Sequence, residues 1–165
     1  MPVLDFGGVE TCTALLAEHL DRSEFDLRVC TFWKAGHVAE RIGKSGVEVD
    51  VLSVDPSIRN PAATSKLARY LRRVRPHILH SAIAEANFHG ALAGKIAGVP
   101  AVIGEEVGTP DRSGVGRIAF AGIYRLLDCI IGVSRATSNY LVNEEFAPPS
   151  RVKTLYNPVD DAFFE

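Results

Sequence analysis

The sequence contains few cysteines and none of the spacings that build metal sites. Its three cysteines, Cys12, Cys30 and Cys129, lie far apart in apolar surroundings. An odd number of widely spaced cysteines predicts buried free thiols in a reducing, cytoplasmic compartment and argues against a disulfide framework. No Cys-x-x-Cys pair and no Cys/His ligand spacing occurs, so the sequence indicates no zinc site.

The chain also lacks an excess of positive charge and long apolar runs. Its 18 basic and 20 acidic residues give a net charge of −2. A protein that binds nucleic acid by neutralising phosphates usually carries a basic excess, so we expect no nucleic-acid partner. No apolar run approaches the roughly 20 residues that span a bilayer, and no signal-peptide pattern is present.

Strand patterns alternate with helical patterns along the 165 residues. The predicted strands are 27–32, 47–54, 78–82, 101–105, 129–133 and 152–156, and the predicted helices are 9–20, 38–45, 60–74, 85–97, 115–127 and 135–146. Strands separated by helices of this length form right-handed βαβ units and a parallel sheet. The expected fold is therefore α/β, with a doubly wound, mainly parallel, Rossmann-like sheet covered by helices on both faces.

Local signals predict where several helices begin and end and which faces they bury. Asn60 caps a helix that Pro61 starts, Gly98 ends the helix 85–97, and Ser134 caps the helix after it. The expected core-facing stripes are Phe88, Leu92 and Ile96 in one helix and Val9, Cys12, Leu16 and Leu20 in another.

Candidate functional residues follow the predicted strands, because doubly wound sheets bind ligands at the carboxyl ends of their strands. Gly7 and Gly8 precede a helix, where glycines let a phosphate approach backbone N–H groups. A plain tight turn explains the pair equally well. It is neither a GxGxxG fingerprint nor a P-loop, so no dinucleotide or ATP site is indicated.

Glu105 and Glu106 end a predicted strand at this ligand-binding edge. Their carboxylates could accept hydrogen bonds from sugar hydroxyls, or one could act as a base. Since successive side chains of a strand point to opposite faces, we expect at most one of them in a cleft and a structural role for the other.

Polar residues near the other strand ends have two interpretations each. His80 is either a packed core histidine or a cleft residue, and Asn87 either caps the next helix or lines the cleft. We expect His89 at the surface. Ser134 is expected to cap its helix, although the same helix end could hold an anion.

Six short segments, in order, carry a resemblance to a known family. They are Gly7-Gly8-Val9-Glu10, residues 75–81, residues 90–93, residues 97–104, residues 130–134 and residues 156–160 followed by Phe163 or Phe164. Together these segments resemble the N-terminal domain of family 4 retaining glycosyltransferases, which have the two-domain GT-B architecture.

The resemblance implies transfer of a sugar from a nucleotide-sugar donor to a glycan or lipid-linked acceptor, with retention and with no metal or other cofactor. It implies donor binding by Gly7 and Gly8. Residues 1–156 would form the N-terminal domain, and 157–165 would begin the linker to a C-terminal domain that grips the donor. The predicted catalytic residues are Glu106 and Glu105, and the predicted acceptor-binding residues are His80, Asn87, Ser134 and Arg135.

The chain departs from the family pattern at three places. Val107 occupies the position of a histidine that many members carry. Pro158 replaces a more common glycine. The first strand of the sheet is missing, so we expect residues before Met1 and after Glu165 in the natural protein, and no activity from this chain alone.

Two alternatives remain open at this stage, a non-catalytic sugar- or nucleotide-binding module and half of a sugar-nucleotide epimerase. Residues 115–127 are interpreted mainly as a core helix. Because Arg117 and Arg125 flank its apolar residues, a peripheral contact at the inner membrane face is the alternative.

Overall fold

A computed structural model describes residues 1–2, 4–5, 7–110, 112 and 114–159. The last six residues of the expected linker, 160–165, lie outside the described part. Two compact units make up the chain. Unit 1 contains Met1–Val54, and unit 2 contains Asp55–Tyr156.

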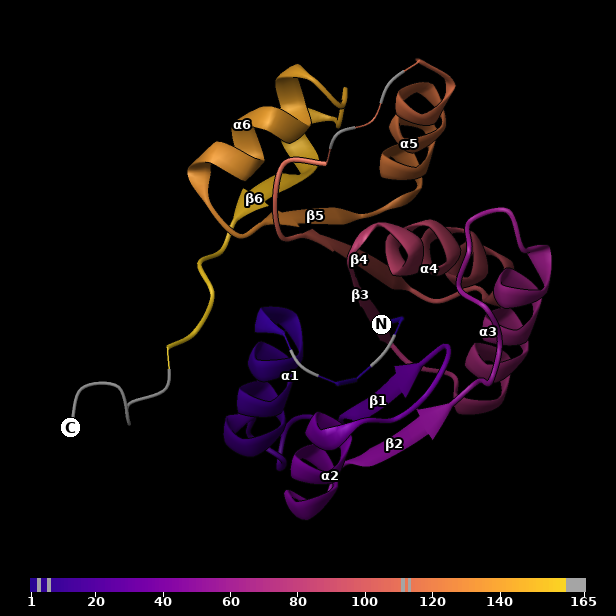
Figure 1. The fold of residues 1–165 in the computed structure, drawn as a ribbon, viewed down its shortest axis with the longest axis vertical. Coiled ribbons are helices and arrows are strands. Elements are labelled where there is room, and N and C mark those ends of the chain that lie inside the picture. Colours follow the sequence, from indigo (N-terminus) through magenta and orange to yellow (C-terminus); the bar gives the residue numbers. More distant parts are fainter. Residues whose placement is uncertain (3, 6, 111, 113, 160–165) are drawn as a thin grey trace. The chain divides into compact units, whose positions relative to one another are not determined.

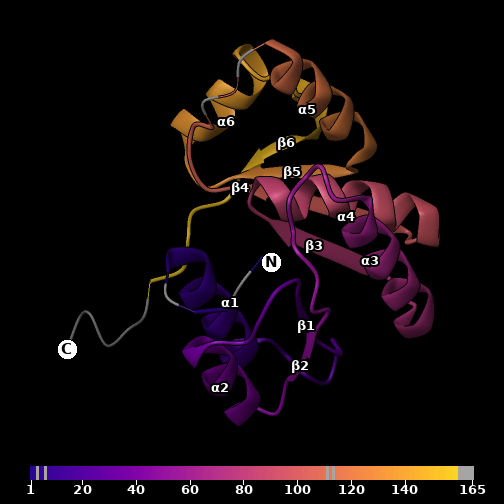
Figure 2. The same cartoon turned by 45° about the vertical axis from the view of Figure 1, so that its right-hand side comes forward.

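Unit 1 is a pair of parallel strands with two helices. Strands β1 (Arg28–Thr31) and β2 (Glu48–Val51) pair in register from Arg28 opposite Glu48. Helices α1 (Gly8–His19) and α2 (His37–Lys44) lie on one side of these strands (Figures 1 and 2). The core between them consists of Leu4, Ala14, Ala17, Val29, Ala39, Ile42 and Val47.

The first residues of the chain extend this small sheet. The backbone N–H of Phe32 donates to the carbonyl of Met1 at 3.0 Å, and Leu4 forms a parallel bridge with Ala35. Pro2 has no N–H to donate, but its carbonyl accepts hydrogen bonds there. A short parallel segment therefore lies beside the end of β1 and leads to Gly7.

Unit 2 is a four-stranded parallel sheet with the strand order β3-β4-β5-β6. Its strands are β3 (Ile78–Ala82), β4 (Ala101–Glu106), β5 (Cys129–Gly132) and β6 (Val152–Thr154), and its helices are α3 (Pro61–Val74), α4 (Ala84–Ala97), α5 (Gly114–Leu126), α6 (Arg135–Asn143) and the 3₁₀ turn η1 (Pro149–Arg151). The strand–helix alternation and the parallel pairing confirm the predicted α/β class.

The predicted buried stripe of α4 is wrong at Ile96, whereas Phe88 and Leu92 are half-buried. Ile96 is 52% exposed, and small residues turn toward the sheet instead. A methyl group placed on Gly94 would lie 2.7 Å from a Val102 side-chain carbon, and one on Gly90 would lie 3.0 Å from the Ser81 hydroxyl. The helix packs so close to β3 and β4 that large side chains fit only at its margins.

In helix α1, too, the buried residues differ from those that the sequence predicted. Leu16, which the apolar spacing placed in the core, is 41% exposed. The buried side chains are Ala14, Leu15 and Ala17. In α4, the periodicity of large apolar residues missed the small residues that pack against the sheet. In α1, it placed Leu16 in the core, whereas the neighbouring Leu15 is buried.

The predicted helix ends are confirmed. The Asn60 side chain accepts a hydrogen bond from the N–H of Ala62 at 3.1 Å, with Pro61 as the first helical residue. The hydroxyl of Ser134 accepts from the N–H of Thr137 at 3.0 Å. Gly98 closes α4 in the left-handed conformation, with φ 74°.

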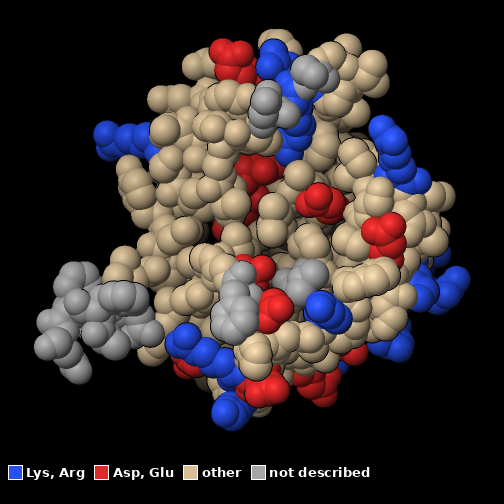
Figure 3. Space-filling model, viewed as in Figure 1, with Lys and Arg blue, Asp and Glu red and all other residues tan. Residues whose placement is uncertain are grey.

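The surface shows basic and acidic side chains mixed together, without a broad region of one sign on the face in view (Figure 3). Among the described helices, none has the length and apolar character needed to cross a membrane.

Candidate functional site

A buried polar network lies at the carboxyl end of β4. Glu106 is only 3% exposed, yet its Oε1 accepts three hydrogen bonds. The donors are the Tyr124 hydroxyl at 2.9 Å, the Arg112 guanidinium at 3.1 Å and the Asn87 amide at 3.2 Å. A buried carboxylate is stable only with such partners, so these contacts hold Glu106 in the core of unit 2.

Arg112 is the centre of this network. It donates to Glu106, to the Tyr124 hydroxyl at 2.7 Å and to Glu145, which is fully buried, at 3.0 Å. Its guanidinium also stacks on the Phe120 ring, 3.5 Å from the centroid. Two carboxylates therefore compensate one cation, and the stacked ring fixes its position.

The network sets the protonation states of its members. Burial alone lowers the pKa of Arg112, but Glu106, Tyr124 and Glu145 outweigh that effect and raise the pKa above its ordinary value. Burial, followed by the Glu106 charge, raises the pKa of Tyr124. Arg112 thus stays a cation, and Tyr124 keeps the proton that it donates to Glu106.

Asn87 ties the network to the sheet. Its side chain is fully buried, donates to the Glu105 carbonyl at 2.8 Å and accepts from the Ser81 hydroxyl at 3.0 Å. Gly104 leaves the space for it, because a methyl group there would lie 3.3 Å from the Asn87 oxygen and 2.5 Å from Leu127. Asn87 joins β3, β4 and α4, and its predicted contact with an acceptor stays a prediction.

Glu105 lies on the opposite face of β4 and pairs with His80. The distance between His80 Nε2 and Glu105 Oε2 is 2.9 Å, with the side chains 40% and 14% exposed. The alternation of Glu105 and Glu106 along the strand is as predicted. Glu106 is enclosed by donors, whereas the Glu105–His80 pair is within reach of solvent.

A cavity of about 510 Å³ opens where β3 and β4 end. We call it the strand-end pocket. Its walls combine carboxylates, small apolar groups and an aromatic ring. The lining residues are Asp55, Pro56, Ser57, Ile58, Ala84, Glu85, Arg112, Gly116 and Phe120. All of them belong to unit 2.

His89 braces one wall of this pocket from behind. The expectation that it lies at the surface is wrong, because its side chain is fully buried. Its Nε2 lies 3.0 Å from the Pro56 carbonyl and 3.2 Å from the Ser57 carbonyl, and its Nδ1 lies 2.8 Å from the Thr64 hydroxyl. Since carbonyls only accept, Nε2 carries the proton, and His89 holds the wall segment 55–58 onto α3 and α4.

Ile83 shapes the other side of the pocket through its backbone. It connects β3 to α4 with φ 75° and ψ 156°, a conformation used almost only by glycine. Hydrogen bonds to both of its backbone groups hold this geometry, one to the Glu105 carbonyl at 3.0 Å and one from the N–H of Asn87 at 2.8 Å. The strained turn presents Ala84 and Glu85 to the pocket.

A sequence profile of the family described as "Glycosyltransferase Family 4" matches residues 6–163. The chain belongs to glycosyltransferase family 4. No curated protein sequence is significantly similar to it.

A solved structure shares the fold of this family 4 chain. It is titled "Crystal Structure of Glycosyltransferase from Rickettsia africae ESF-5" and superposes with a TM-score of 0.75 at 15% sequence identity. The match covers 96% of the family 4 chain and 42% of the Rickettsia africae chain. The family 4 chain thus corresponds to less than half the length of that glycosyltransferase, and the agreement supports a Rossmann-like fold of the GT-B type.

The other predicted site residues of the family 4 chain lie at helix starts. Ser134 uses its hydroxyl as a cap, and Arg135 is the exposed first residue of α6. In unit 1, Gly7 precedes α1 without any side-chain cap, and nothing lies within 4 Å of a methyl group placed on Gly8. The Glu10 carboxylate folds back over Gly7, since its Oε2 would lie 2.2 Å from a methyl group there.

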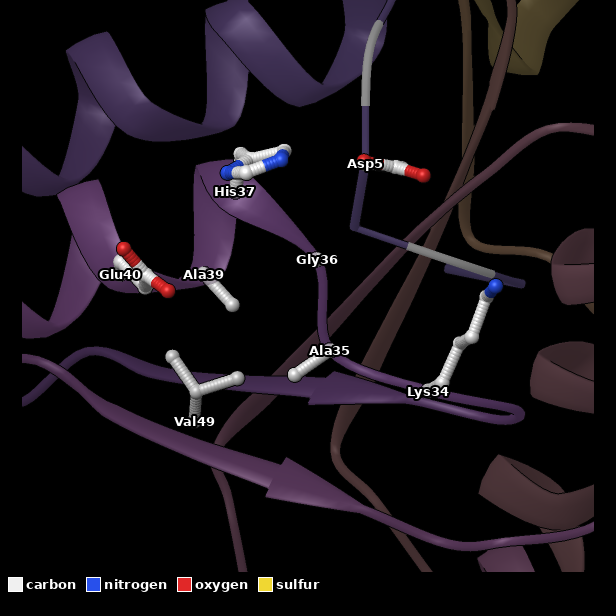
Figure 4. A pocket seen from close by; sticks show the side chains of 8 residues that line it. All are labelled: Asp5, Lys34, Ala35, Gly36, His37, Ala39, Glu40 and Val49. Atoms are coloured by element: carbon white, nitrogen blue, oxygen red, sulfur yellow. The ribbon is translucent and has the colours of Figure 1, made fainter.

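Unit 1 has a hollow of its own, about 520 Å³ in volume (Figure 4). Charged side chains of both signs, Asp5, Lys34 and Glu40, surround it together with His37. The other lining residues are Ala35, Gly36, Ala39 and Val49. Gly36 is required here, because a methyl group would lie 2.6 Å from the Leu4 carbonyl oxygen. The close fit fixes the loop between β1 and α2.

Sequence reasoning missed the strand-end pocket. Asp55 and Ile58 fall in a segment without periodicity, and Arg112 lies in the loop after β4, six positions beyond Glu106. Phe120 belongs to the segment 115–127, for which the sequence indicated a core helix or a membrane contact and no pocket. The available signal was a lone arginine in the loop after a strand that ends in a carboxylate. Among the described residues, no group of three or more His, Cys, Asp or Glu could hold a metal ion.

Proposed function

We propose that this family 4 domain is the acceptor-side half of a retaining glycosyltransferase of GT-B architecture, which uses a nucleotide-sugar donor. The hydroxyl oxygen of the acceptor forms a bond to the anomeric carbon of the donor, and the bond from that carbon to the nucleotide diphosphate breaks. The diphosphate leaves with the electron pair, and the hydroxyl proton passes to it or to solvent. No metal and no other cofactor is part of this proposal.

The observation that carries the proposal is the composition of the strand-end pocket. Carboxylates such as Asp55 and Glu85 accept hydrogen bonds from sugar hydroxyls, and the exposed Ile58 side chain offers apolar surface to the C–H face of a sugar ring. The pocket also lies at the carboxyl ends of parallel strands, where α/β sheets bind their ligands.

The remaining roles follow from the contacts. We propose that Glu105, with His80 beside it, reaches the substrate, because it is the partly exposed member of the glutamate pair. Glu106 and Asn87 act as positioning residues through Arg112. Donor binding by Gly7 and Gly8 rests on bare N–H groups at the start of α1. Ser134 and Arg135 would contact the distal part of the acceptor.

A transfer assay with the complete natural protein tests this proposal. Release of nucleoside diphosphate from nucleotide-sugar donors is measured with and without hydroxyl acceptors. We expect acceptor-dependent release that Glu85→Gln weakens at least fivefold in kcat/KM, while the exposed control Glu24→Gln leaves it unchanged. Isomerisation of the donor without an acceptor would instead support an epimerase, and binding without turnover would support a non-catalytic module.

We also propose that α5 touches a membrane surface. Phe120, Ile123 and Tyr124 face the core, as expected for the packed side of this helix. Val115 is 83% exposed and Ile118 is 72% exposed. The helix carries two arginines and no acidic residue, a combination that suits an anionic lipid surface.

Vesicle sedimentation distinguishes a specific contact of α5 with the membrane from a general electrostatic attraction between the protein and anionic lipid. We expect binding to vesicles containing anionic phospholipid, and a loss of at least fivefold in the Val115→Asp, Ile118→Asp double variant. Equal sedimentation of the double variant and the natural protein would exclude α5 as the contact. The control Ile96→Asp changes an apolar residue of α4 that is 52% exposed, and this variant should sediment like the natural protein.

A further inference from the structure

The strand-end pocket has an unusual charge balance. Its three charged lining residues are Asp55, Glu85 and Arg112. The cation already has carboxylate partners, since Arg112 pairs with Glu106 at 3.1 Å and with Glu145 at 3.0 Å. Its guanidinium is also stacked on Phe120 and only 10% exposed. The positive charge of Arg112 is therefore already balanced by carboxylates of the protein itself.

The two lining carboxylates have no such compensation. No ion pair of Asp55 or Glu85 occurs among the described residues. The Asp55 carboxylate accepts a hydrogen bond from the N–H of Ser57 at 3.0 Å, and the Asp55 carbonyl accepts from the Asn60 amide at 2.9 Å. The other titratable group near this wall, His89, lies behind it and points its Nε2 proton at the Pro56 carbonyl. Within the described residues, the lining side chains therefore include two carboxylates without an ion-pair partner and one cation that is already paired.

We infer that the acceptor group bound in the strand-end pocket is a neutral or amine-bearing polyol, and that the pocket rejects phosphorylated or carboxylated sugars. This inference rests on the proposed acceptor role of the pocket and deepens it. Hydroxyl and ammonium groups donate hydrogen bonds to Asp55 and Glu85. A phosphate or carboxylate can only accept, and it meets two like charges.

The walls of the pocket are held rigid, so it cannot readily reshape to avoid an anionic group. His89 fixes the segment 55–58 through two carbonyls, and the strained turn at Ile83 fixes Glu85. A preorganised site discriminates between ligands because a ligand group that does not match the site finds no hydrogen-bond partner there. A unit charge about 4 Å from a carboxylate changes affinity by about fivefold in bulk water and by up to about a thousandfold at the effective dielectric of a protein surface.

Matched acceptors measure this selectivity in the complete natural protein. The acceptors are methyl glycosides of one hexose in neutral, 2-amino, 6-carboxylate and 6-phosphate forms. We expect the kcat/KM for the amino and neutral forms to exceed that for the anionic forms by about tenfold or more. Glu85→Gln combined with Asp55→Asn should shrink this ratio at least threefold, and Glu24→Gln should not change it.

A binding measurement separates this inference from the proposed activity. Chemical-shift changes at the amides of Ser57 and Glu85 are followed while glucosamine or glucose 6-phosphate is added. We expect shifts with glucosamine and none with the phosphate. Transfer to no acceptor together with these shifts would defeat the proposed function and keep the inference. Preferred binding or transfer of the phosphate or carboxylate forms would overturn the inference.

Discussion

Unit 2 contains two sets of carboxylates, separated by a single arginine. Behind Arg112, Glu106 and Glu145 are buried and paired with cationic or hydroxyl donors. In front of it, Asp55 and Glu85 line an open pocket and have no cationic partner among the described residues. The difference teaches that a carboxylate with its own cation serves the fold, whereas one left without a cation is available to a ligand.

Removing a carboxylate from the paired set should have the largest effect. Glu106→Ala leaves Arg112 buried with one partner fewer and removes the acceptor of Tyr124 and Asn87. We expect a loss of about 3–5 kcal/mol in the free energy of unfolding, measured in urea. Glu85→Gln, in the unpaired set, should change it by less than about 0.5 kcal/mol. Equal losses would remove the distinction between the two sets.

Releasing the wall of the pocket should have an intermediate effect. His89→Leu keeps the volume but leaves the carbonyls of Pro56 and Ser57 without their donor, at a cost of roughly 1–3 kcal/mol. We also expect the acceptor KM to rise several-fold with little change in kcat. His89→Gln, which can still donate to these carbonyls, should restore KM. A fall in kcat with unchanged KM would contradict the bracing role.

Filling the space beside Asn87 tests how tightly the paired set is packed. Gly104→Ala places a methyl group 2.5 Å from Leu127, so we expect a loss of roughly 1–3 kcal/mol in thermal or urea unfolding. The control is Gly122→Ala on the exposed side of α5, where nothing lies within 4 Å. That variant should gain about 0.5–1 kcal/mol from helix propensity. A neutral Gly104→Ala would show a loosely packed network.

The smallest expected effect concerns an exposed but partnered carboxylate. Asp128 accepts from the N–H of Val102 at 2.9 Å, and Lys95 lies 3.2 Å away. The Val102 N–H, followed by Lys95, holds the pKa of Asp128 below its ordinary value. A lowered pKa contributes stability above the unfolded-state value near 4, and the contribution is lost as pH falls through the folded-state value.

Asp128→Asn should therefore cost roughly 0.5–1 kcal/mol at pH 7, a figure reduced for solvent screening, and little at pH 3 or below. Urea unfolding at a series of pH values measures the difference. A constant difference between the Asp128 variant and the natural protein would assign the effect to packing.

The alternation of strands and helices, the parallel sheets and the caps at Asn60, Gly98 and Ser134 were predictable from the sequence. They depend on local patterns that tertiary packing did not override. The buried face of α4 was not predictable, because close contact with the sheet selected small residues over Ile96. In α1, the apolar spacing did not distinguish the exposed Leu16 from the buried Leu15.

Only a few residues of the candidate site were predictable from the sequence. Glu105, Glu106 and Asn87 follow strands and could be found, but their partners could not. The hydrogen-bonded residues Arg112 and Glu145 are 33 positions apart in the sequence. His89 and Pro56, which are also hydrogen-bonded, are 33 positions apart as well. Such contacts have no local signature. Only folding reveals that Glu106 is enclosed while Glu85 faces a cavity.

The central claim is tested most directly by measuring unfolding and acceptor kinetics on the same two variants, Glu85→Gln and Glu106→Gln. The account predicts that Glu85→Gln unfolds like the natural protein but loses at least fivefold in kcat/KM for the neutral and amino acceptors. Glu106→Gln should lose at least about 2 kcal/mol of stability. A destabilised Glu85→Gln with full acceptor kinetics, beside an equally stable Glu106→Gln, would contradict it.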